Sequence, residues 1–259
     1  MLIAPLFVPG HRPERFAKAA AAGADAVIID LEDAVPPEEK AAARANAAAA
    51  RLDGIPVYVR INPAGTRWYS EDVAALADAD LAGILLPKAE SPATIDAMRR
   101  LIGVLDVIPL IESARGLAAV REIAAGGAAA LAFGSLDFAA DLGCAHTRQA
   151  LLAARSELVL ASRLAGIGAP LDGVTARINE DALAEDDARH AAELGFGGKL
   201  VIHPRQVAPV LRGFAPGPGE VEWARRVMDA GGGGAVSVDG MMIDAPVRMR
   251  AERILARAR

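Results

Sequence analysis

Two carboxylates, Glu112 and Asp137, each follow a short apolar run and lie 25 residues apart in the sequence. Glu112 ends the run Val107–Ile111, and Asp137 follows Leu131–Phe133, with no Cys or His directly beside either acid. Oxygen ligands suit a hard ion such as Mg²⁺, which is commonly held by very few carboxylates while water fills the remaining positions. We therefore predict that Glu112 and Asp137 bind Mg²⁺, or Mn²⁺ in its place. The alternative is that each acid only caps a helix or a loop amide.

A third candidate, Arg60, ends the apolar run Val57–Val59. A guanidinium that leaves a buried strand is costly unless it meets an anion. Its planar fork matches a carboxylate or an enolate oxygen. We therefore predict that Arg60 binds substrate oxygens and acts in catalysis. It could instead pair with acids of the neighbouring strand, and both roles are compatible because such a pair would fix the direction of the arginine.

Those neighbouring acids are Asp30, Glu32 and Asp33, which lie within four residues at the end of another apolar run. Mutual repulsion and lack of room argue against all of them binding one metal ion. We interpret them as groups that organise water and orient the metal and substrate ligands from behind.

The segment from Phe7 to Arg15 combines an apolar run, a glycine turn at Gly10 and a helix start. Backbone amides together with Arg12 or Arg15 could hold a phosphate there, so Arg12 is a candidate substrate-binding residue. The single His203 before Pro204 is interpreted as structural rather than as a catalytic base.

Eight apolar runs, most of them separated by alanine-rich helical stretches, would position these residues. The runs are Leu2–Val8, Ala26–Ile29, Val57–Val59, Ile84–Leu86, Val107–Ile111, Leu131–Phe133, Pro170–Leu171 and Leu200–Ile202. Strands that alternate with helices indicate parallel βαβ units, and eight such units predict an α/β protein with a closed (β/α)₈ TIM barrel. Barrel enzymes place their chemistry at the carboxyl ends of the strands, where the polar groups lie here.

The pattern changes after the eighth run. We predict a barrel domain over residues 1–213 and a C-terminal extension over residues 214–259, which packs on its own barrel or on a neighbouring subunit. A turn-rich connector and a helix lead to the glycine run Gly231–Gly234. Two short strands around Asp239-Gly240 and a final basic helix, Val247–Arg259, complete a hairpin-helix appendage.

The composition indicates a globular protein that acts on small molecules. The chain has 259 residues, of which 53% are hydrophobic, and a net charge of −5 without a basic patch for nucleic acid. Its one cysteine, Cys144, excludes an internal disulfide and predicts a reducing, cytoplasmic location. No apolar run is long enough to span a membrane, and no signal peptide is expected.

As a set, these motifs resemble the HpcH/HpaI aldolase/citrate lyase family, in particular proteins like the citrate lyase beta subunit. The matching segments are Leu6–Phe16, Asp25–Val35, Val59–Asn62, Leu86–Glu90, Pro109–Glu112, Phe133–Gly143, Gly198–Pro204 and Met242–Pro246. The resemblance implies a (β/α)₈ barrel in trimers or hexamers, with a divalent ion on Glu112 and Asp137 and with Arg60 on the same end of the substrate. It also implies that Asp244, in the C-terminal extension, reaches the active site of an adjacent subunit and transfers a proton.

The function implied is a Mg²⁺-dependent carbon–carbon lyase. It would cleave or form a β-hydroxyacyl thioester such as citryl-, malyl- or citramalyl-CoA, with a 2-oxo acid and acetyl-CoA as the other partners. The alternatives are a metal-dependent pyruvate-type aldolase without a thioester, a subunit of a citrate lyase complex that needs partners, and a metal-dependent carbon–oxygen lyase or hydrolase. Asp33 stands near the place where the aldolase branch has a histidine, which favours the thioester branch.

Overall fold

A single parallel sheet of eight strands, in the order β1 to β8, forms the centre of the protein. The computed structural model describes residues 2–103, 105–230, 236–238 and 241–258. The strands are β1 (Leu6–Pro9), β2 (Val27–Asp30), β3 (Val57–Arg60), β4 (Gly83–Leu86), β5 (Asp106–Ile111), β6 (Ala132–Phe133), β7 (Leu171–Asp172) and β8 (Gly198–Lys199). Each strand pairs with the next along the chain, as the alternating pattern of the sequence predicts.

The sheet curls until its last strand reaches its first. The Phe7 amide donates to the Val201 carbonyl at 2.8 Å, the Val201 amide to Pro5 at 3.0 Å, and the Lys199 amide to Ile3 at 2.8 Å. This arrangement is consistent with the predicted (β/α)₈ barrel. The eighth strand begins earlier than the predicted run Leu200–Ile202. Gly198–Lys199 pairs with β7, and within the predicted run Val201 forms a bridge with Leu6 of β1.

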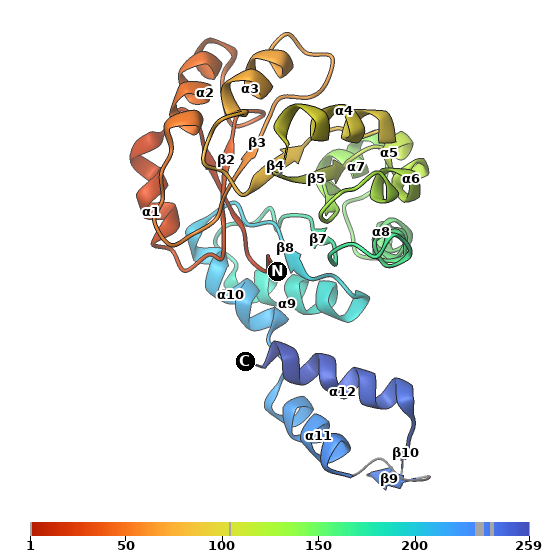
Figure 1. Cartoon of the computed structure of the whole chain (residues 1–259). Coiled ribbons are helices and arrows are strands. Elements are labelled where there is room, and N and C mark those ends of the chain that lie inside the picture. Colours follow the sequence, from red (N-terminus) through yellow and green to blue (C-terminus); the bar gives the residue numbers. More distant parts are fainter. Residues whose placement is uncertain (1, 104, 231–235, 239–240, 259) are drawn as a thin grey trace.

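Helices surround the curled sheet (Figure 1). They are α1 (Phe16–Ala20), α2 (Lys40–Ala49), α3 (Tyr69–Leu76), α4 (Pro92–Ile102), α5 (Ala114–Ala118), α6 (Val120–Ala125), α7 (Ser135–Leu142), α8 (Leu152–Ala165), α9 (Asp181–Leu194) and α10 (Pro204–Phe214), with the short 3-10 turns η1 (Pro13–Arg15) and η2 (Pro37–Glu39). Helix α4 illustrates the local signals. The Ser91 side chain caps it by accepting from the Ala93 amide, and Gly103 ends it at a φ of 64°.

Both faces of the sheet are buried. Alternate strand residues such as Ile28, Leu85 and Leu110 pack in the interior, whereas Val27 and Val59 pack outward with the helices. Burial on both faces explains why the strands are continuous apolar runs rather than alternating ones. Polar side chains therefore gather where the strands end.

The C-terminal extension forms a separate pair of helices. Helix α11 (Pro218–Asp229), strands β9 (Val236–Val238) and β10 (Met241–Ile243), and helix α12 (Ala245–Arg257) follow α10. The two strands pair antiparallel, and α11 and α12 share a small core that includes Ala224, Val227 and Ile254. Figure 1 shows this pair projecting away from the sheet. The glycine run and the Asp239-Gly240 turn lie outside the described residues, and the domain boundary at residue 213 stays a prediction.

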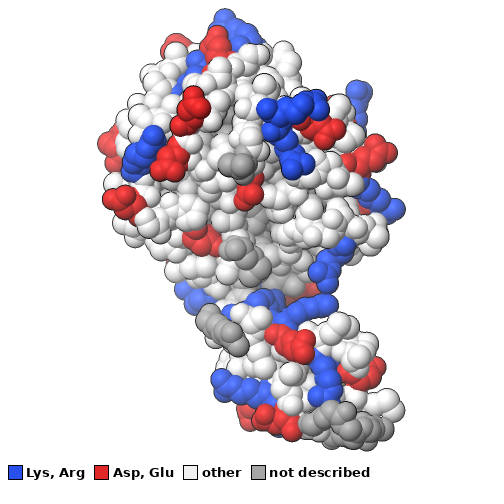
Figure 2. All heavy atoms as spheres, viewed as in Figure 1, with Lys and Arg blue, Asp and Glu red and all other residues white. Residues whose placement is uncertain are grey.

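The charged side chains on the surface are mixed in sign. On the face shown in Figure 2, Lys and Arg are interspersed with Asp and Glu, both around the curled sheet and on the extension. That face has no broad patch of a single sign. Within the described part of the chain, every helix is too short or too polar to cross a membrane.

Candidate active site

A cavity of about 440 Å³ lies at the carboxyl ends of the strands. Its lining includes Asp30, Asp33, Arg60, Glu112 and Asp137. These residues follow or end β2, β3, β5 and β6, so the fold brings five of the residues singled out from the sequence to one place.

Glu112 comes directly after β5 and is 4% exposed. Its Oε1 atom accepts a hydrogen bond of 2.6 Å from the backbone amide of Lys88, which follows β4. Burial raises the pKa of Glu112 to about 8, and the nearby carboxylates of Glu32 and Asp137 act in the same direction. Among the described residues that line the cavity, four carboxyl groups accompany a single cation, Arg60.

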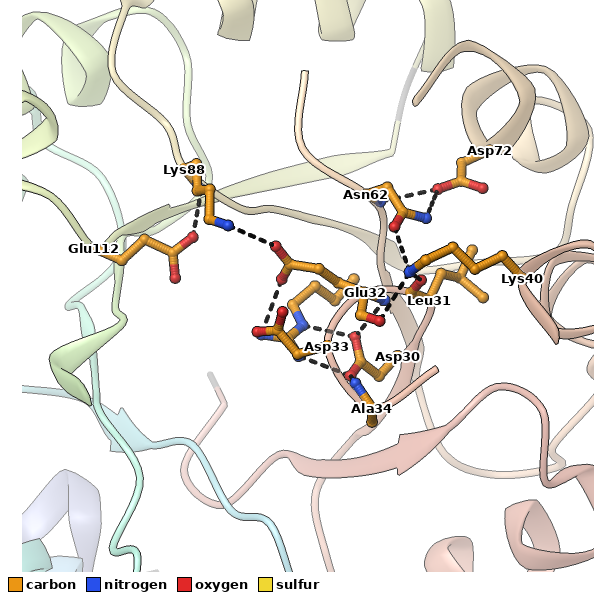
Figure 3. Close-up of polar contacts among 11 residues, drawn as sticks. Asp30, Leu31, Glu32, Asp33, Ala34, Lys40, Asn62, Asp72, Lys88 and Glu112 are labelled. Atoms are coloured by element: carbon orange, nitrogen blue, oxygen red, sulfur yellow. Dashed lines mark hydrogen bonds and ion pairs between the residues drawn. The ribbon is translucent and has the colours of Figure 1, made fainter. Parts of the chain in front are cut away.

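Lys88, which follows β4, is not among the site residues predicted from the sequence. Lys88 has a φ of 50° and is the only non-glycine residue with a positive φ in the described chain. Such a backbone conformation costs free energy and is often found at functional sites. Here it presents the amide to Glu112, and the ammonium group lies 3.7 Å from Glu32 (Figure 3).

Arg60 and Asp30 form a two-point pair at the ends of β3 and β2. Arg60 Nε lies 2.7 Å from Asp30 Oδ1, and Nη2 lies 2.7 Å from Oδ2. Burial would raise the pKa of Asp30, but the charge and hydrogen bonds of Arg60 outweigh it and hold that pKa below its usual value. The predicted pairing of Arg60 with the acids after β2 is thus present, and Arg60 still lines the cavity.

Glu32 is buried beside this pair. Its carboxylate lies 3.1 Å from Arg60 Nη1, but neither of its oxygens has a hydrogen-bond partner in the described structure. Burial raises the pKa of Glu32 to about 7, and the charges of Asp33 and Asp30 act in the same direction. Its position behind the cavity lining, next to Arg60 and Lys88, fits the predicted supporting role.

The buried Lys40 holds the loop that carries Glu32, a role that the sequence analysis missed. Its ammonium donates to the Leu31 carbonyl at 2.8 Å, to the Glu32 carbonyl at 2.9 Å and to Asn62 Oδ1 at 2.7 Å (Figure 3). The Trp68 ring lies 4.9 Å from the same ammonium. In the sequence Lys40 looks like any surface lysine at a helix start, and only the fold places it under the site.

Asp137 lies in the first turn of α7 and is exposed on the cavity side. Next to it, the buried Ser135 hydroxyl lies 3.0 Å from His146 Nε2 and anchors the start of the helix. No group of three or more His, Cys, Asp or Glu side chains among the described residues is arranged around one metal position. Glu112 and Asp137, the pair predicted to hold a metal ion, both line the cavity.

The fold does not bring every predicted residue to the cavity. Arg12 is exposed beside the start of η1, where its Nε donates to Glu14 at 2.6 Å. Asp244 is exposed on the extension and caps α12 by accepting a 3.1 Å hydrogen bond from the Val247 amide. Asp244 therefore does not line the cavity of its own chain. Its neighbouring residues in Met241–Pro246 suggest an apolar setting, but its side chain is exposed. His203 caps α10, in agreement with its structural interpretation.

One family model matches most of the chain. The family model described as HpcH/HpaI aldolase/citrate lyase matches residues 4–204, which include all eight strands and the whole cavity lining. The chain belongs to the HpcH/HpaI aldolase/citrate lyase family. The resemblance drawn from the sequence motifs is confirmed, and so is the prediction of an enzyme of the carbon–carbon lyase type.

Named relatives within the HpcH/HpaI aldolase/citrate lyase family cover several activities. The chain is 40% identical to the "Citrate lyase subunit beta-like protein" of Mycobacterium tuberculosis, over 98% of this chain and 94% of that protein. It is 35% identical to the "L-malyl-CoA/beta-methylmalyl-CoA lyase" of Cereibacter sphaeroides, over 98% and 93%. It is 32% identical to a "(3S)-malyl-CoA thioesterase" of the same species, also over 98% and 93%.

A solved structure of the family resembles the whole chain. It is protein CitE from Mycobacterium tuberculosis in complex with magnesium, acetoacetate and coenzyme A. The TM-score is 0.90 at 39% identity, and the match covers 99% of this chain and 97% of that one. The likeness therefore extends through the C-terminal helices as well as the curled sheet.

Proposed function

We propose that this protein is a Mg²⁺-dependent carbon–carbon lyase built on a (β/α)₈ barrel. It cleaves or forms a β-hydroxyacyl thioester such as citryl-, malyl- or citramalyl-CoA, with a 2-oxo acid and acetyl-CoA as the other partners. The observation that carries the proposal is that Glu112, Asp137 and Arg60 line one cavity at the strand ends. The magnesium and coenzyme A bound to the similar CitE structure support it.

The residues of the site fit a divalent ion. The carboxyl groups in and beside the cavity outnumber its cations, and they belong to Asp30, Glu32, Asp33, Glu112 and Asp137. Burial raises the pKa of Glu112, and a bound cation would favour its ionised form. In the proposal Glu112 and Asp137 hold Mg²⁺, or Mn²⁺ in its place. When bound, the ion supplies positive charge that stabilises the oxygens of the 2-oxo acid.

Arg60 acts on the same oxygens. The Asp30 carboxylate accepts hydrogen bonds from Nε and Nη2 of Arg60. A guanidinium has five N–H donors, so others remain for a substrate oxygen. Asp30 fixes the plane of the guanidinium, so the remaining donors are oriented before the substrate arrives. Glu32, Asp33 and Lys40 keep this pair and the loop beside it in place.

Cleavage requires a base for the β-hydroxyl proton. As that proton leaves, the carbonyl of the 2-oxo acid forms and the carbon–carbon bond breaks. Its electron pair stays with the acetyl thioester as the enolate, which then takes a proton on carbon. In the proposal Asp244 takes the hydroxyl proton, and the enolate carbon then receives a proton, so that no net proton is lost. Asp244 would come from a neighbouring subunit, because it does not line the cavity of its own chain.

Several further assignments belong to the same proposal. The protein is a cytoplasmic homo-oligomer, a trimer or hexamer, in which residues 214–259 reach over a neighbour. Arg12, which is exposed near the strand ends, binds a phosphate of the thioester carrier. In this proposal the cavity of one chain is completed by Arg12 at its rim and by Asp244 from a neighbouring chain.

The alternatives differ in their products. A pyruvate-type aldolase would act without any thioester, and a citrate lyase subunit would need partner chains. A hydrolase, which the thioesterase relative favours as a second candidate, would release free coenzyme A and leave the carbon–carbon bond intact.

A direct assay separates these functions. Purified protein with Mg²⁺ is incubated with malyl-, citramalyl- and citryl-CoA, and acetyl-CoA, free CoA and 2-oxo acid are quantified by mass spectrometry. The proposal predicts equal amounts of acetyl-CoA and 2-oxo acid from at least one thioester, with loss of turnover in EDTA. Free CoA without acetyl-CoA would identify a hydrolase instead. No turnover of any thioester by protein that binds Mn²⁺ would contradict the proposal.

A further inference from the structure

The cavity lining divides into a charged part and an apolar part. The charged part consists of the carboxylates and Arg60 described above. Most of the remaining side chains are hydrocarbon, and among them Phe7, Leu110, Val174 and Leu200 belong to the packed interior of the sheet. Phe133, Leu136 and Ile202 extend the apolar lining, and Leu136 and Ile202 are partly exposed to solvent.

Apart from the metal ion of the proposed function, the described side chains that line the cavity offer little positive charge to a substrate. Among the described residues that line it, Arg60 is the only cation, alongside the carboxylates of Asp30, Asp33, Glu112 and Asp137. Arg60 itself is bound at two points by Asp30 at 2.7 Å and lies 3.1 Å from Glu32. The nearby ammonium of Lys88 also faces a carboxylate, that of Glu32, at 3.7 Å.

The candidate 2-oxo acids differ in the charge of one substituent. Glyoxylate, pyruvate and oxaloacetate share the carboxylate and keto oxygen that the metal and Arg60 would bind. Beyond these, glyoxylate carries a hydrogen, pyruvate a methyl group and oxaloacetate a second carboxylate. A carboxylate placed among hydrocarbon side chains or beside other carboxylates loses its hydration without gaining a partner. A methyl group gains from the same surroundings.

We infer that the site takes a 2-oxo monocarboxylate with a small uncharged substituent, as in glyoxylate or pyruvate, and discriminates against oxaloacetate. Its thioester substrates are therefore of the malyl or citramalyl type rather than the citryl type. This inference rests on the proposed lyase function. It deepens that function by naming the substrate class from the charge and polarity of the cavity lining.

The inference is tested by comparing kcat/KM of the wild-type protein for the three thioesters. The expected kcat/KM for citramalyl- or malyl-CoA exceeds that for citryl-CoA by at least about tenfold, which corresponds to about 1.4 kcal/mol. A citryl-CoA value equal to or above both others would overturn the inference while leaving the lyase function in place. The failure of all three substrates would instead count against the proposed function.

A binding experiment judges the inference even without turnover. The ligands are 2-oxobutyrate and freshly dissolved oxaloacetate, which differ mainly in a methyl group against a carboxylate. Calorimetric titration of each into the Mg²⁺-loaded protein is expected to give at least about tenfold tighter binding of 2-oxobutyrate. Assay of the oxaloacetate left at the end corrects for its decarboxylation. Equal or tighter binding of oxaloacetate would overturn the inference.

A pair of variants tests whether charge causes the discrimination between oxaloacetate and 2-oxobutyrate. Ile202, which is 37% exposed at the cavity, is replaced by Arg in one variant and by the uncharged Met in the other. The ratio of oxaloacetate to 2-oxobutyrate affinity should rise severalfold in Ile202→Arg and stay near the wild-type value in Ile202→Met. An equal ratio in both variants, with unchanged circular dichroism, would assign any discrimination to shape and overturn the charge argument.

Discussion

The Arg60 guanidinium meets the Asp30 carboxylate edge to edge, with both Nε–Oδ1 and Nη2–Oδ2 at 2.7 Å. The pair joins neighbouring strands at the register position Asp30↔Arg60. Both side chains are largely buried, so water could not solvate either charge if its partner were removed. The pair therefore links the ends of β2 and β3. It also orients Arg60, which is the only cation among the described residues that line the cavity.

The first prediction concerns this geometry. Lysine keeps the charge of Arg60 but cannot bind Asp30 at two points, so Arg60→Lys should not restore function. We expect at least about a tenfold loss of 2-oxo acid affinity, measured by calorimetry with Mg²⁺ present. Asp30→Ala should be worse for folding, because it leaves the Arg60 charge buried without its partner, at a cost of about 3–5 kcal/mol. Wild-type affinity in a folded Arg60→Lys variant would remove the substrate role.

A second prediction follows from the raised pKa of Glu112, about 8 without a metal ion. The folded state binds this proton more tightly than the unfolded state, so the stabilisation is complete at low pH and is lost as pH rises to about 8. In EDTA, the free energy of unfolding should therefore fall by about 1–3 kcal/mol between about pH 5 and about pH 8.

The matched control is Glu112→Gln, which has no proton to lose. Urea unfolding at both pH values should show a smaller decrease in this variant than in the wild type. Added Mg²⁺ should reverse the decrease in the wild type alone, because the ion favours the ionised carboxylate. An identical pH dependence in both proteins would show that Glu112 does not titrate in this range.

The predictable part of this structure is the part that depends on local pattern. The runs that end at Asp30, Arg60 and Glu112 are buried on both faces, so their hydrophobic length marks the strands and the first polar residue marks each carboxyl end. The topology of a curled parallel sheet then brings those ends together. Glu112 and Asp137 could be named for the same reason.

The missed part depends on tertiary contacts that no local pattern records. Nothing near Lys88 in the sequence marks a positive φ, since glycine and asparagine are the residues that usually adopt it. Lys40 resembles a solvent-exposed lysine until α2 packs beside the loop after β2. The neighbouring subunit that we propose for Asp244 likewise leaves no signal in the sequence around that residue.

Lys88 supplies the third prediction, which separates its backbone from its side chain. Lys88→Gly and Lys88→Val both remove the ammonium, but only glycine adopts a positive φ without strain. Lys88→Val should therefore move the amide away from Glu112 and weaken Mn²⁺ binding about tenfold relative to Lys88→Gly, in line with about 1–2 kcal/mol of backbone strain. Equal Mn²⁺ affinities by calorimetry would show that the conformation of residue 88 does not support the metal ligand.

A fourth prediction tests whether sites are shared between subunits. Asp244→Ala and Asp137→Ala chains should each be inactive alone. Mixed oligomers should regain part of the activity, because some sites then contain both an intact Asp137 and an intact Asp244 from a neighbour. Subunit exchange is verified separately by native mass spectrometry with a mass-tagged chain. Exchange without any recovered activity would mean that Asp244 does not act in a neighbouring site.

The central claim is that Glu112 and Asp137 hold the divalent ion on which the reaction depends. Titration of Mn²⁺ into wild-type and Asp137→Ala protein by calorimetry tests it most directly, since Asp137 is exposed and its removal should leave the fold intact. We predict one ion per chain for the wild type and no measurable binding for Asp137→Ala, with identical circular dichroism. Unchanged Mn²⁺ affinity in Asp137→Ala would contradict the account.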